Sequence, residues 1–322
     1  IQVPSDCNNL DASPDVDAGT KPAVVPLNEP YSVLTEEKVN SFAEKHNCLP
    51  YFDLKSFLSA DIDAVYIATP HDSHFFYSME AIKRKLHVLC EKPLSVNSTE
   101  AMILINEAKK NDVFLMEAFM YRTHPQTFEI LELCKKYLKN ANVKILSSFG
   151  FDAPVDKSHR LRNLNLAGGA ILDVGCYPLS ILNLFYKDPD SYKFLNTKGN
   201  LTHTNVDDFA EAEIEINKKI RCQIKVSFKE NYQNKTIIEG QKGKLIINSP
   251  WLPEKQTNLE ISQGSSYYKK IVNSDLSLYA NQIEKVSDNF EKNKKDDKFL
   301  VNIQSSLAIM KNMSIWLKLI RK

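Results

Sequence analysis

The chain has 322 residues, of which 43% are hydrophobic and 25% are charged, as in an ordinary globular protein, and its length is enough for two domains. A net charge of +1 gives no electrostatic reason to expect nucleic acid or an anionic membrane as a partner. No apolar stretch approaches the roughly 18 residues that span a bilayer, and residues 1–25 lack the basic start and apolar core of a secretory signal.

The first part of the chain divides into an atypical segment and a helical one. Residues 1–31 hold five of the 14 prolines, five acidic residues and one lysine, a composition that predicts loop or disorder. Residues 36–46 then have the apolar spacing of an amphipathic helix, for which Thr35 is a plausible cap.

A run of alternating strands and helices follows. Residues 64–68 and 87–90 are short and uniformly apolar, which is typical of parallel strands buried on both faces. Helical spacing at 71–84 and 99–110 and a further buried strand at 113–116 complete a βαβαβ unit. We therefore expect a Rossmann-like doubly wound parallel sheet with an atypical or incomplete N-terminal part, in a partial dinucleotide-binding domain over residues 32–120.

Beyond Tyr121 the pattern predicts an α+β domain over residues 121–322 with a large, mainly antiparallel sheet. Gly240 and Gly243 mark a tight turn within a rapid succession of strands, and little helical pattern intervenes. The predicted strands are 143–151, 209–216, 220–228, 235–239, 244–247, 259–262 and 267–272, and the predicted helices are 130–138, 168–185 and 301–320. The lysine-rich residues 292–298 suggest a solvated loop. Strands 209–216 and 220–228 are apolar on one side and few helices are predicted to cover the sheet, so we expect a homodimer built on this face.

Two polar turns follow the first two buried strands, Thr69-Pro70 and Glu91-Lys92-Pro93. In an open parallel sheet the carboxyl ends of the strands form the ligand crevice. Pro93 restricts Lys92 to extended conformations and so holds its side chain in one direction. Lys92 is therefore a candidate for a catalytic or cofactor-binding role, although an ordinary lysine at a loop start is a surface residue.

Three motifs resemble the Gfo/Idh/MocA oxidoreductases. The first is the A-T-P at residues 68–70 with the E-K-P at 91–93. The others, M-E-A-F-M-Y-R at 116–122 and G-G-A-I-L-D-V-G-C-Y-P at 168–178, are similar to the branch that contains dihydrodiol and D-xylose dehydrogenases. The resemblance implies an enzyme that uses NADP, with NAD also open. It would move hydride between the nicotinamide and a vicinal diol or sugar carbinol.

The resemblance implies a catalytic set of Lys92, Tyr177 and Asp173. Tyr177 stands where the family usually has histidine and would take the alcohol proton. Because a free phenol has a pKa near 10, we expect the ammonium of Lys92 to lower the pKa of Tyr177 toward neutrality. Asp173, four residues before Tyr177, could bind substrate hydroxyls or orient the lysine, or equally cap the helix that follows Gly168 and Gly169.

Further contacts are implied for both ligands. The predicted cofactor-binding residues are Ala68, Thr69, Pro70, His74, Glu91, Lys92, Pro93 and Arg122. The predicted substrate-binding residues are Arg122, Phe151, Asp173, Tyr177 and Trp251. Two of them have a plain structural alternative: His74 as a hydrogen-bonding group at a helix start, and Trp251 as a packing residue. The cysteines lack CxxC pairs or metal-ligand spacing, so we expect reduced thiols, no metal and a cytoplasmic location.

A dinucleotide site normally includes a glycine-rich turn whose amides approach the pyrophosphate. The first glycine here is Gly19, and no G-x-G-x-x-G precedes Asp63. The apolar residues Ala23, Val24 and Val25 are bracketed by prolines, which central strands reject, so we expect no strand there. Such a chain could be a fragment or flawed gene model, an alternative product, or a divergent homologue. The competing function is therefore a dimeric scaffold without catalysis or cofactor.

Overall fold

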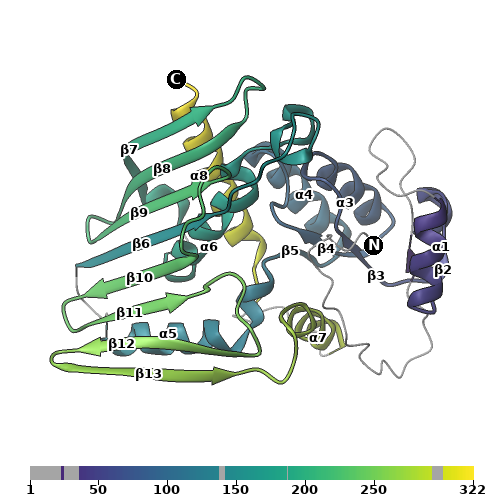
Figure 1. The fold of residues 1–322 in the computed structure, drawn as a ribbon. Coiled ribbons are helices and arrows are strands. Elements are labelled where there is room, and N and C mark those ends of the chain that lie inside the picture. The colour runs from purple at the N-terminus through teal and green to yellow at the C-terminus, as the bar shows by residue number, and fades with distance from the viewer. Residues whose placement is uncertain (1–22, 25–35, 138–141, 187, 292–299) are drawn as a thin grey trace.

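The computed structural model describes residues 23–24, 36–137, 142–186, 188–291 and 300–322. Two bodies lie side by side, a small parallel sheet with its helices and a broad mixed sheet backed by helices on one face (Figure 1). This arrangement confirms the predicted combination of a Rossmann-like part and an α+β part. The boundaries assigned to the domains remain predictions.

The parallel sheet consists of three strands in the order β3-β4-β5, with all neighbours parallel. The strands are β3 (Ala64–Ile67), β4 (His87–Glu91) and β5 (Leu115–Ala118), and the crossover helices are α3 (His74–Lys83) and α4 (Ser98–Asn111). Asn97 caps α4, where its side chain accepts the Glu100 N–H. Because the strands are parallel, their carboxyl ends, which carry the polar turns, lie at one edge of the sheet.

A second, two-stranded sheet precedes this one. Strand β1 (Ala23–Val24) pairs in parallel with β2 (Leu49–Pro50), and helices α1 (Glu36–Lys45) and α2 (Leu54–Leu58) belong to the same region. The expectation of no strand near Ala23 is therefore wrong for these two residues. A strand of only two residues fits between flanking prolines, whereas a longer central strand would not. Thr35 lies outside the described residues.

The large sheet has eight strands in the order β13-β12-β11-β10-β6-β9-β8-β7. Only β6 and β9 are parallel neighbours, so the sheet is mainly antiparallel as expected. Its strands are β6 (Val143–Gly150), β7 (Tyr192–Leu201), β8 (Asp207–Ile216), β9 (Ile220–Ser227), β10 (Lys235–Gly240), β11 (Gly243–Asn248), β12 (Gln256–Gln263) and β13 (Ser266–Asn273). The predicted turn is the β10–β11 hairpin, where Gly240 faces Gly243.

Helices cover one face of this sheet (Figure 1). They are α5 (Pro125–Tyr137), α6 (Cys176–Phe185) and α8 (Ile303–Ile320), while α7 (Leu278–Glu291) packs near residues 120–123. The apolar side chains of β8 and β9, such as Ile214 and Ile224, are fully buried beneath them. The expectation that this apolar side is free for dimerisation is therefore wrong. The predicted loop at 292–298 lies outside the described residues.

The segment Leu164–Phe185 is long and apolar enough to cross a membrane by composition, but 89% of its apolar window is buried inside the protein, as in a core helix. It includes a wide helical turn, Ile171–Gly175, that leads directly into α6. Short helical turns also occupy His71–Ser73, Met120–Thr123, Arg160–Arg162, Leu164–Leu166 and Pro189–Ser191.

The start of the wide helical turn at residues 171–175 is tied to the large sheet by Asp207, the first residue of β8. Its Oδ2 accepts the Ile171 N–H at 2.7 Å, and Gly169, with φ +124°, passes so close that an added Cβ would lie 2.4 Å from Asp207 Oδ1. Glycine is needed at this position because of both its backbone angle and this close approach. Burial raises the pKa of Asp207 to about 6.

We expect Gly169→Ala to lower the free energy of unfolding by about 2–4 kcal/mol, since it adds strain and a clash. The matched control is Gly264→Ala in the β12–β13 turn, where φ is +58° and an added Cβ meets nothing within 4 Å. That variant should lose only about 1 kcal/mol. Urea unfolding of both proteins measures the difference, and equal losses would show that the contact with Asp207 is harmless.

Candidate active site

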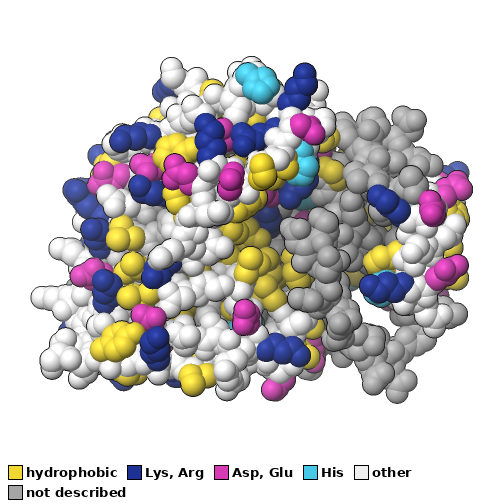
Figure 2. Space-filling view, viewed as in Figure 1, with side chains coloured by type: hydrophobic (Ala, Val, Ile, Leu, Met, Phe, Trp, Pro, Cys, Tyr) yellow, Lys and Arg dark blue, Asp and Glu magenta, His cyan; other side chains and the backbone are white. Residues whose placement is uncertain are grey.

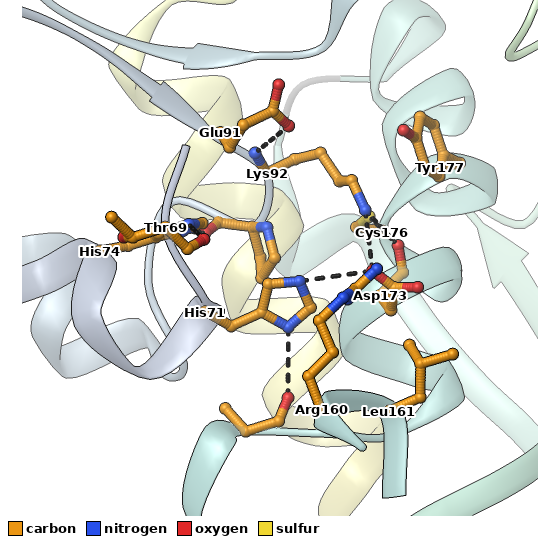
Figure 3. Close-up of polar contacts among 12 residues, drawn as sticks. Thr69, His71, His74, Glu91, Lys92, Arg160, Leu161, Asp173, Cys176 and Tyr177 are labelled. Atoms are coloured by element: carbon orange, nitrogen blue, oxygen red, sulfur yellow. Dashed lines mark hydrogen bonds and ion pairs between the residues drawn. The ribbon is translucent and has the colours of Figure 1, made fainter. Parts of the chain in front are cut away.

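Lys92 leaves the carboxyl end of β4 and crosses toward the segment that precedes α6 (Figure 3). Its Nζ donates to the Asp173 carbonyl oxygen at 2.8 Å and to Asp173 Oδ1 at 3.1 Å. Only 13% of the lysine side chain is exposed. The lysine therefore joins the two parts of the protein and is not a surface residue, and its role with a ligand stays a prediction.

Asp173 is the centre of a cluster of basic side chains. Its Oδ1 also lies 3.3 Å from His71 Nε2 and 3.3 Å from Arg160 Nη1. These partners come from separate elements and converge on one carboxylate (Figure 3). Of the three predicted roles for Asp173, this geometry favours orienting the lysine. The cap before Ile171 is supplied by Asp207, and contact with substrate hydroxyls stays a prediction.

The charges in this cluster stabilise one another. Burial alone would raise the pKa of Asp173, but Lys92, His71 and Arg160 outweigh that effect and hold the pKa well below its usual value. Burial lowers the pKa of Lys92, yet Asp173, with smaller effects from Cys176 and Glu91, outweighs burial and leaves the pKa raised. The resting site therefore holds an ammonium and a carboxylate.

Tyr177 lies beside this pair, in the first turn of α6. The Lys92 Nζ sits 5.1 Å from the centre of the tyrosine ring, a cation–π contact. Among the described residues the Tyr177 hydroxyl donates only to Met120 Sδ, at 3.7 Å. Burial, followed by nearby negative charges, raises the pKa of Tyr177 well above 10. The expectation that Lys92 lowers this pKa is therefore wrong for the resting protein, because the ammonium faces the ring and bonds to Asp173.

Three aromatic side chains pack against the ring of Tyr177. Its ring centre lies 5.3 Å from that of Phe149, 5.7 Å from that of Phe119 and 5.7 Å from that of Trp251. Trp251 is fully buried, which places it as a packing residue beneath the tyrosine. Phe151 is partly buried and packs against Phe149 and Phe228. Their predicted contacts with a substrate stay predictions.

His74 holds two strand ends together. Its Nδ1 lies 2.7 Å from the Pro93 carbonyl oxygen and its Nε2 lies 2.8 Å from that of Thr69, and the ring is completely buried. Burial lowers its pKa to about 4. This geometry matches the structural alternative, in which the histidine sets the shape of the crevice instead of reaching into it.

The other predicted cofactor residues line or support the same edge. Thr69 Oγ1 accepts the Ser73 hydroxyl, and Ala68 is buried directly after β3. Glu91 is buried and accepts the Tyr66 hydroxyl and the Lys92 N–H. Arg122 is also buried, where its Nη1 donates to the Ser180 carbonyl oxygen at 2.9 Å. Arg122 therefore ties residues 120–123 to α6, and its reach to a ligand stays a prediction.

Two site residues were not foreseen from sequence. His71 directly follows Thr69-Pro70, so its place after a buried strand was a usable signal, and its Nδ1 also lies 3.2 Å from the Ala167 carbonyl oxygen. Arg160 falls in an irregular stretch without periodic pattern, and no sequence signal links it to Asp173. Within the described ranges no group of three His, Cys, Asp or Glu side chains could hold a metal ion.

A sheet of parallel strands with a buried lysine at its carboxyl edge, joined to a broad mixed sheet, is typical of two-domain nucleotide-dependent oxidoreductases. Residues 33–119 match the model described as an oxidoreductase family with an NAD-binding Rossmann fold, and residues 142–246 match the GFO/IDH/MocA C-terminal domain. Together the two matches cover more than half of the chain. The chain belongs to the Gfo/Idh/MocA oxidoreductase family.

The chain is similar to curated dehydrogenases over parts of its length. A D-xylose 1-dehydrogenase (NADP(+)) from Haloferax volcanii is 40% identical over 141 residues, which are 44% of this chain and 43% of the relative. A trans-1,2-dihydrobenzene-1,2-diol dehydrogenase from Xenopus laevis is 32% identical over 222 residues, which are 67% of this chain and 66% of the relative. The chain thus spans less than two thirds of the length of each.

Solved structures support the fold. A 3-ketoreductase from Actinomadura kijaniata in complex with NADP and TDP-benzene superposes with a TM-score of 0.79 at 20% identity, covering 90% of this chain and 87% of that one. An aldose-aldose oxidoreductase from Caulobacter crescentus complexed with glycerol superposes with a TM-score of 0.79 at 18% identity, covering 89% of this chain and 87% of that one.

Proposed function

We propose that this protein is an NADP-dependent oxidoreductase that moves hydride between the nicotinamide and a vicinal diol or sugar carbinol. The observation that carries the proposal is the buried Lys92–Asp173 pair beside Tyr177 at the carboxyl edge of the parallel sheet. The relatives, which are D-xylose and dihydrodiol dehydrogenases, favour this activity over a scaffold without catalysis. The five described cysteines are free, which fits the cytoplasmic location that we also propose.

The side chains suit proton transfer to or from a carbinol oxygen. Because its pKa is raised, Tyr177 is a neutral phenol at physiological pH and can give its proton to a carbonyl oxygen in the reducing direction. A thioether is a weak acceptor, so the hydroxyl is free to turn from Met120 to a substrate oxygen. Lys92 can donate to the same oxygen, while Asp173 and the backbone hold its ammonium in place.

The described residues suit the nicotinamide half of the cofactor better than its pyrophosphate half. Thr69, Pro70 and Lys92 lie at neighbouring carboxyl ends of β3 and β4, held together by the buried His74, and would hold the nicotinamide and its ribose. When bound, the nicotinamide accepts or donates the hydride. The glycine-rich turn that normally binds the pyrophosphate does not occur in residues 1–62.

The direct test is an assay of NADP+ reduction with D-xylose and with a trans-dihydrodiol, at cofactor concentrations up to about the millimolar range. Turnover of either class supports the proposal, and the ratio of kcat/KM values identifies the preferred one. Absence of turnover with any diol or sugar would contradict it, and absence of cofactor binding as well would restore the scaffold alternative.

We expect residues 1–322 to bind NADPH weakly. Each charge-assisted hydrogen bond that the pyrophosphate lacks is worth about 1.5–3 kcal/mol. The loss of several such bonds should therefore raise a micromolar dissociation constant by several orders of magnitude. Isothermal calorimetry on the purified chain measures this constant. Micromolar binding would show that residues outside the described ranges supply a pyrophosphate site.

We also propose a homodimer that uses the face of the large sheet opposite the helices. One row across this face places Leu146, Ile237 and Ile246 on adjacent strands β6, β10 and β11, each partly exposed. Charged side chains of both signs gather over β7, β8 and β9 (Figure 2), including Glu213 and Arg221. An apolar centre with a charged rim suits association between copies.

Light scattering at micromolar concentration should therefore report about twice the chain mass. Ile237→Glu places a charge at the centre of the apolar row and should shift the protein to the monomer. The matched control is Ile283→Glu on α7, where an isoleucine is 41% exposed away from this face. A wild-type protein that is strictly monomeric would contradict the proposed dimer.

A further inference from the structure

A second buried carboxylate lies behind the turn that presents Lys92. Glu117 belongs to β5 and faces Cys90 of β4 in the parallel sheet, and only 1% of it is exposed. Its Oε1 accepts the Leu94 N–H at 2.9 Å. Leu94 follows Lys92 and Pro93 and is itself fully buried. This hydrogen bond therefore anchors the end of the turn on the neighbouring strand.

The second oxygen of Glu117 is unusual. It is buried and has no hydrogen-bond partner among the residues that the structure describes. A glutamine or an apolar side chain would fill the same place without burying a charge, so packing alone does not account for a carboxylate here. The Ser306 hydroxyl, in the first turn of α8, and the charges of Arg122 and Lys92 are nearby groups that favour the ionised form of Glu117.

We propose that Glu117 is a positioning residue for Lys92: as an ionised carboxylate it fixes the Leu94 N–H, and with it the turn that aims the lysine at Asp173 and Tyr177. The inference rests on the proposed function only in so far as Lys92 is catalytic. The hydrogen bond and its dependence on ionisation are properties of the resting protein.

The groups around Glu117 set when it is ionised. Burial raises its pKa to about 7, although Ser306, the Leu94 N–H, Arg122 and Lys92 all lower it. Cys90 on β4 and Cys176 on α6 also face it, as weakly acidic thiols whose pKa values burial raises strongly. A carboxylate accepts a hydrogen bond more strongly than the neutral acid does. The turn should therefore be held most tightly above neutral pH and loosen as the pH falls.

The first experiment observes the hydrogen bond itself. In protein labelled with ¹⁵N-leucine, the Leu94 amide is identified by its loss in Leu94→Ile, and its proton shift is followed between about pH 5 and pH 9. We expect a downfield titration with a midpoint near neutrality in the wild type. It should vanish in Glu117→Gln, which retains an acceptor but cannot ionise. A flat profile in the wild type would overturn the proposal, whether or not the protein is an enzyme.

The second experiment asks whether the hydrogen bond serves catalysis. Glu117→Gln should lower kcat by about tenfold, leave KM within about twofold, and remove a limb of the pH–kcat profile near neutrality. Glu117→Asp restores the charge at a shorter reach and should recover the limb in part. Wild-type kcat and pH dependence in Glu117→Gln would overturn the positioning role. A wild-type protein without turnover would instead refute the proposed function, and the amide titration would still decide the hydrogen bond.

Discussion

Tyr177→Phe and Lys92→Met are each expected to lower kcat by about 10²-fold or more, the usual scale for losing a general acid–base group. Among the described residues the phenol hydroxyl has only Met120 Sδ as a partner, so its removal disturbs little besides proton transfer. Lys92→Met also removes the cation 5.1 Å from the tyrosine ring centre. Because Lys92 does not set the pKa of Tyr177 in the resting protein, the loss in Lys92→Met should come from the missing donor to the substrate oxygen.

The matched control is Tyr192→Phe. Tyr192 is the first residue of β7, and its hydroxyl donates to the Tyr186 carbonyl oxygen at 2.8 Å, away from the cluster around Asp173. Its loss should cost about 1 kcal/mol of stability and leave kcat unchanged. Steady-state kinetics with the preferred substrate separates the two tyrosines. An unchanged kcat in Tyr177→Phe would remove the tyrosine from the mechanism and leave Lys92 as the proton donor.

The sequence predicted well those parts of the fold in which local pattern and packing agree. Strands β3 and β4 are uniformly apolar because both faces of a parallel sheet are covered, and the turns that follow them carry the residues now seen at the site. Elements with weak local patterns were missed. Strand β7 is largely exposed, with a polar sequence around Lys198 and Asn200, and α2 is only five residues long.

The site was predictable as a set of residues and less so as a geometry. Lys92, Asp173 and Tyr177 do come together, because the end of β4 meets the helical segment that leads into α6. The pKa of Tyr177 was predicted to be lowered and is instead raised, because the sequence cannot tell whether an ammonium contacts the hydroxyl or the face of the ring. Glu117 and Asp207 were missed for a related reason: an acidic residue that accepts a distant backbone N–H leaves no local periodicity.

Asp173→Asn is expected to lower the free energy of unfolding by about 3–5 kcal/mol at neutral pH, because it leaves the buried Lys92 without its carboxylate. The folded-state pKa of Asp173 lies well below its unfolded value near 4. The carboxylate therefore stabilises the protein fully above that unfolded value, and the contribution is lost as the pH falls toward the folded pKa. The difference between wild type and variant should shrink in acid.

Arg160→Ala is the matched control, since it removes a partner of the same Oδ1 atom. The arginine side chain is 45% exposed, so its ion pair is screened by water and should contribute less than about 1 kcal/mol. Urea unfolding of both variants between about pH 3 and pH 8 tests the contrast. Without Asp173, burial should also bring the pKa of Lys92 below its usual value, which ¹³Cε shifts would detect. Two results together would contradict this view: Asp173→Asn loses no more unfolding free energy than Arg160→Ala, and the Lys92 ¹³Cε shift titrates at the same pH as in the wild type. Lys92 would then be held by its hydrogen bond to the backbone of residue 173 and not by the carboxylate charge.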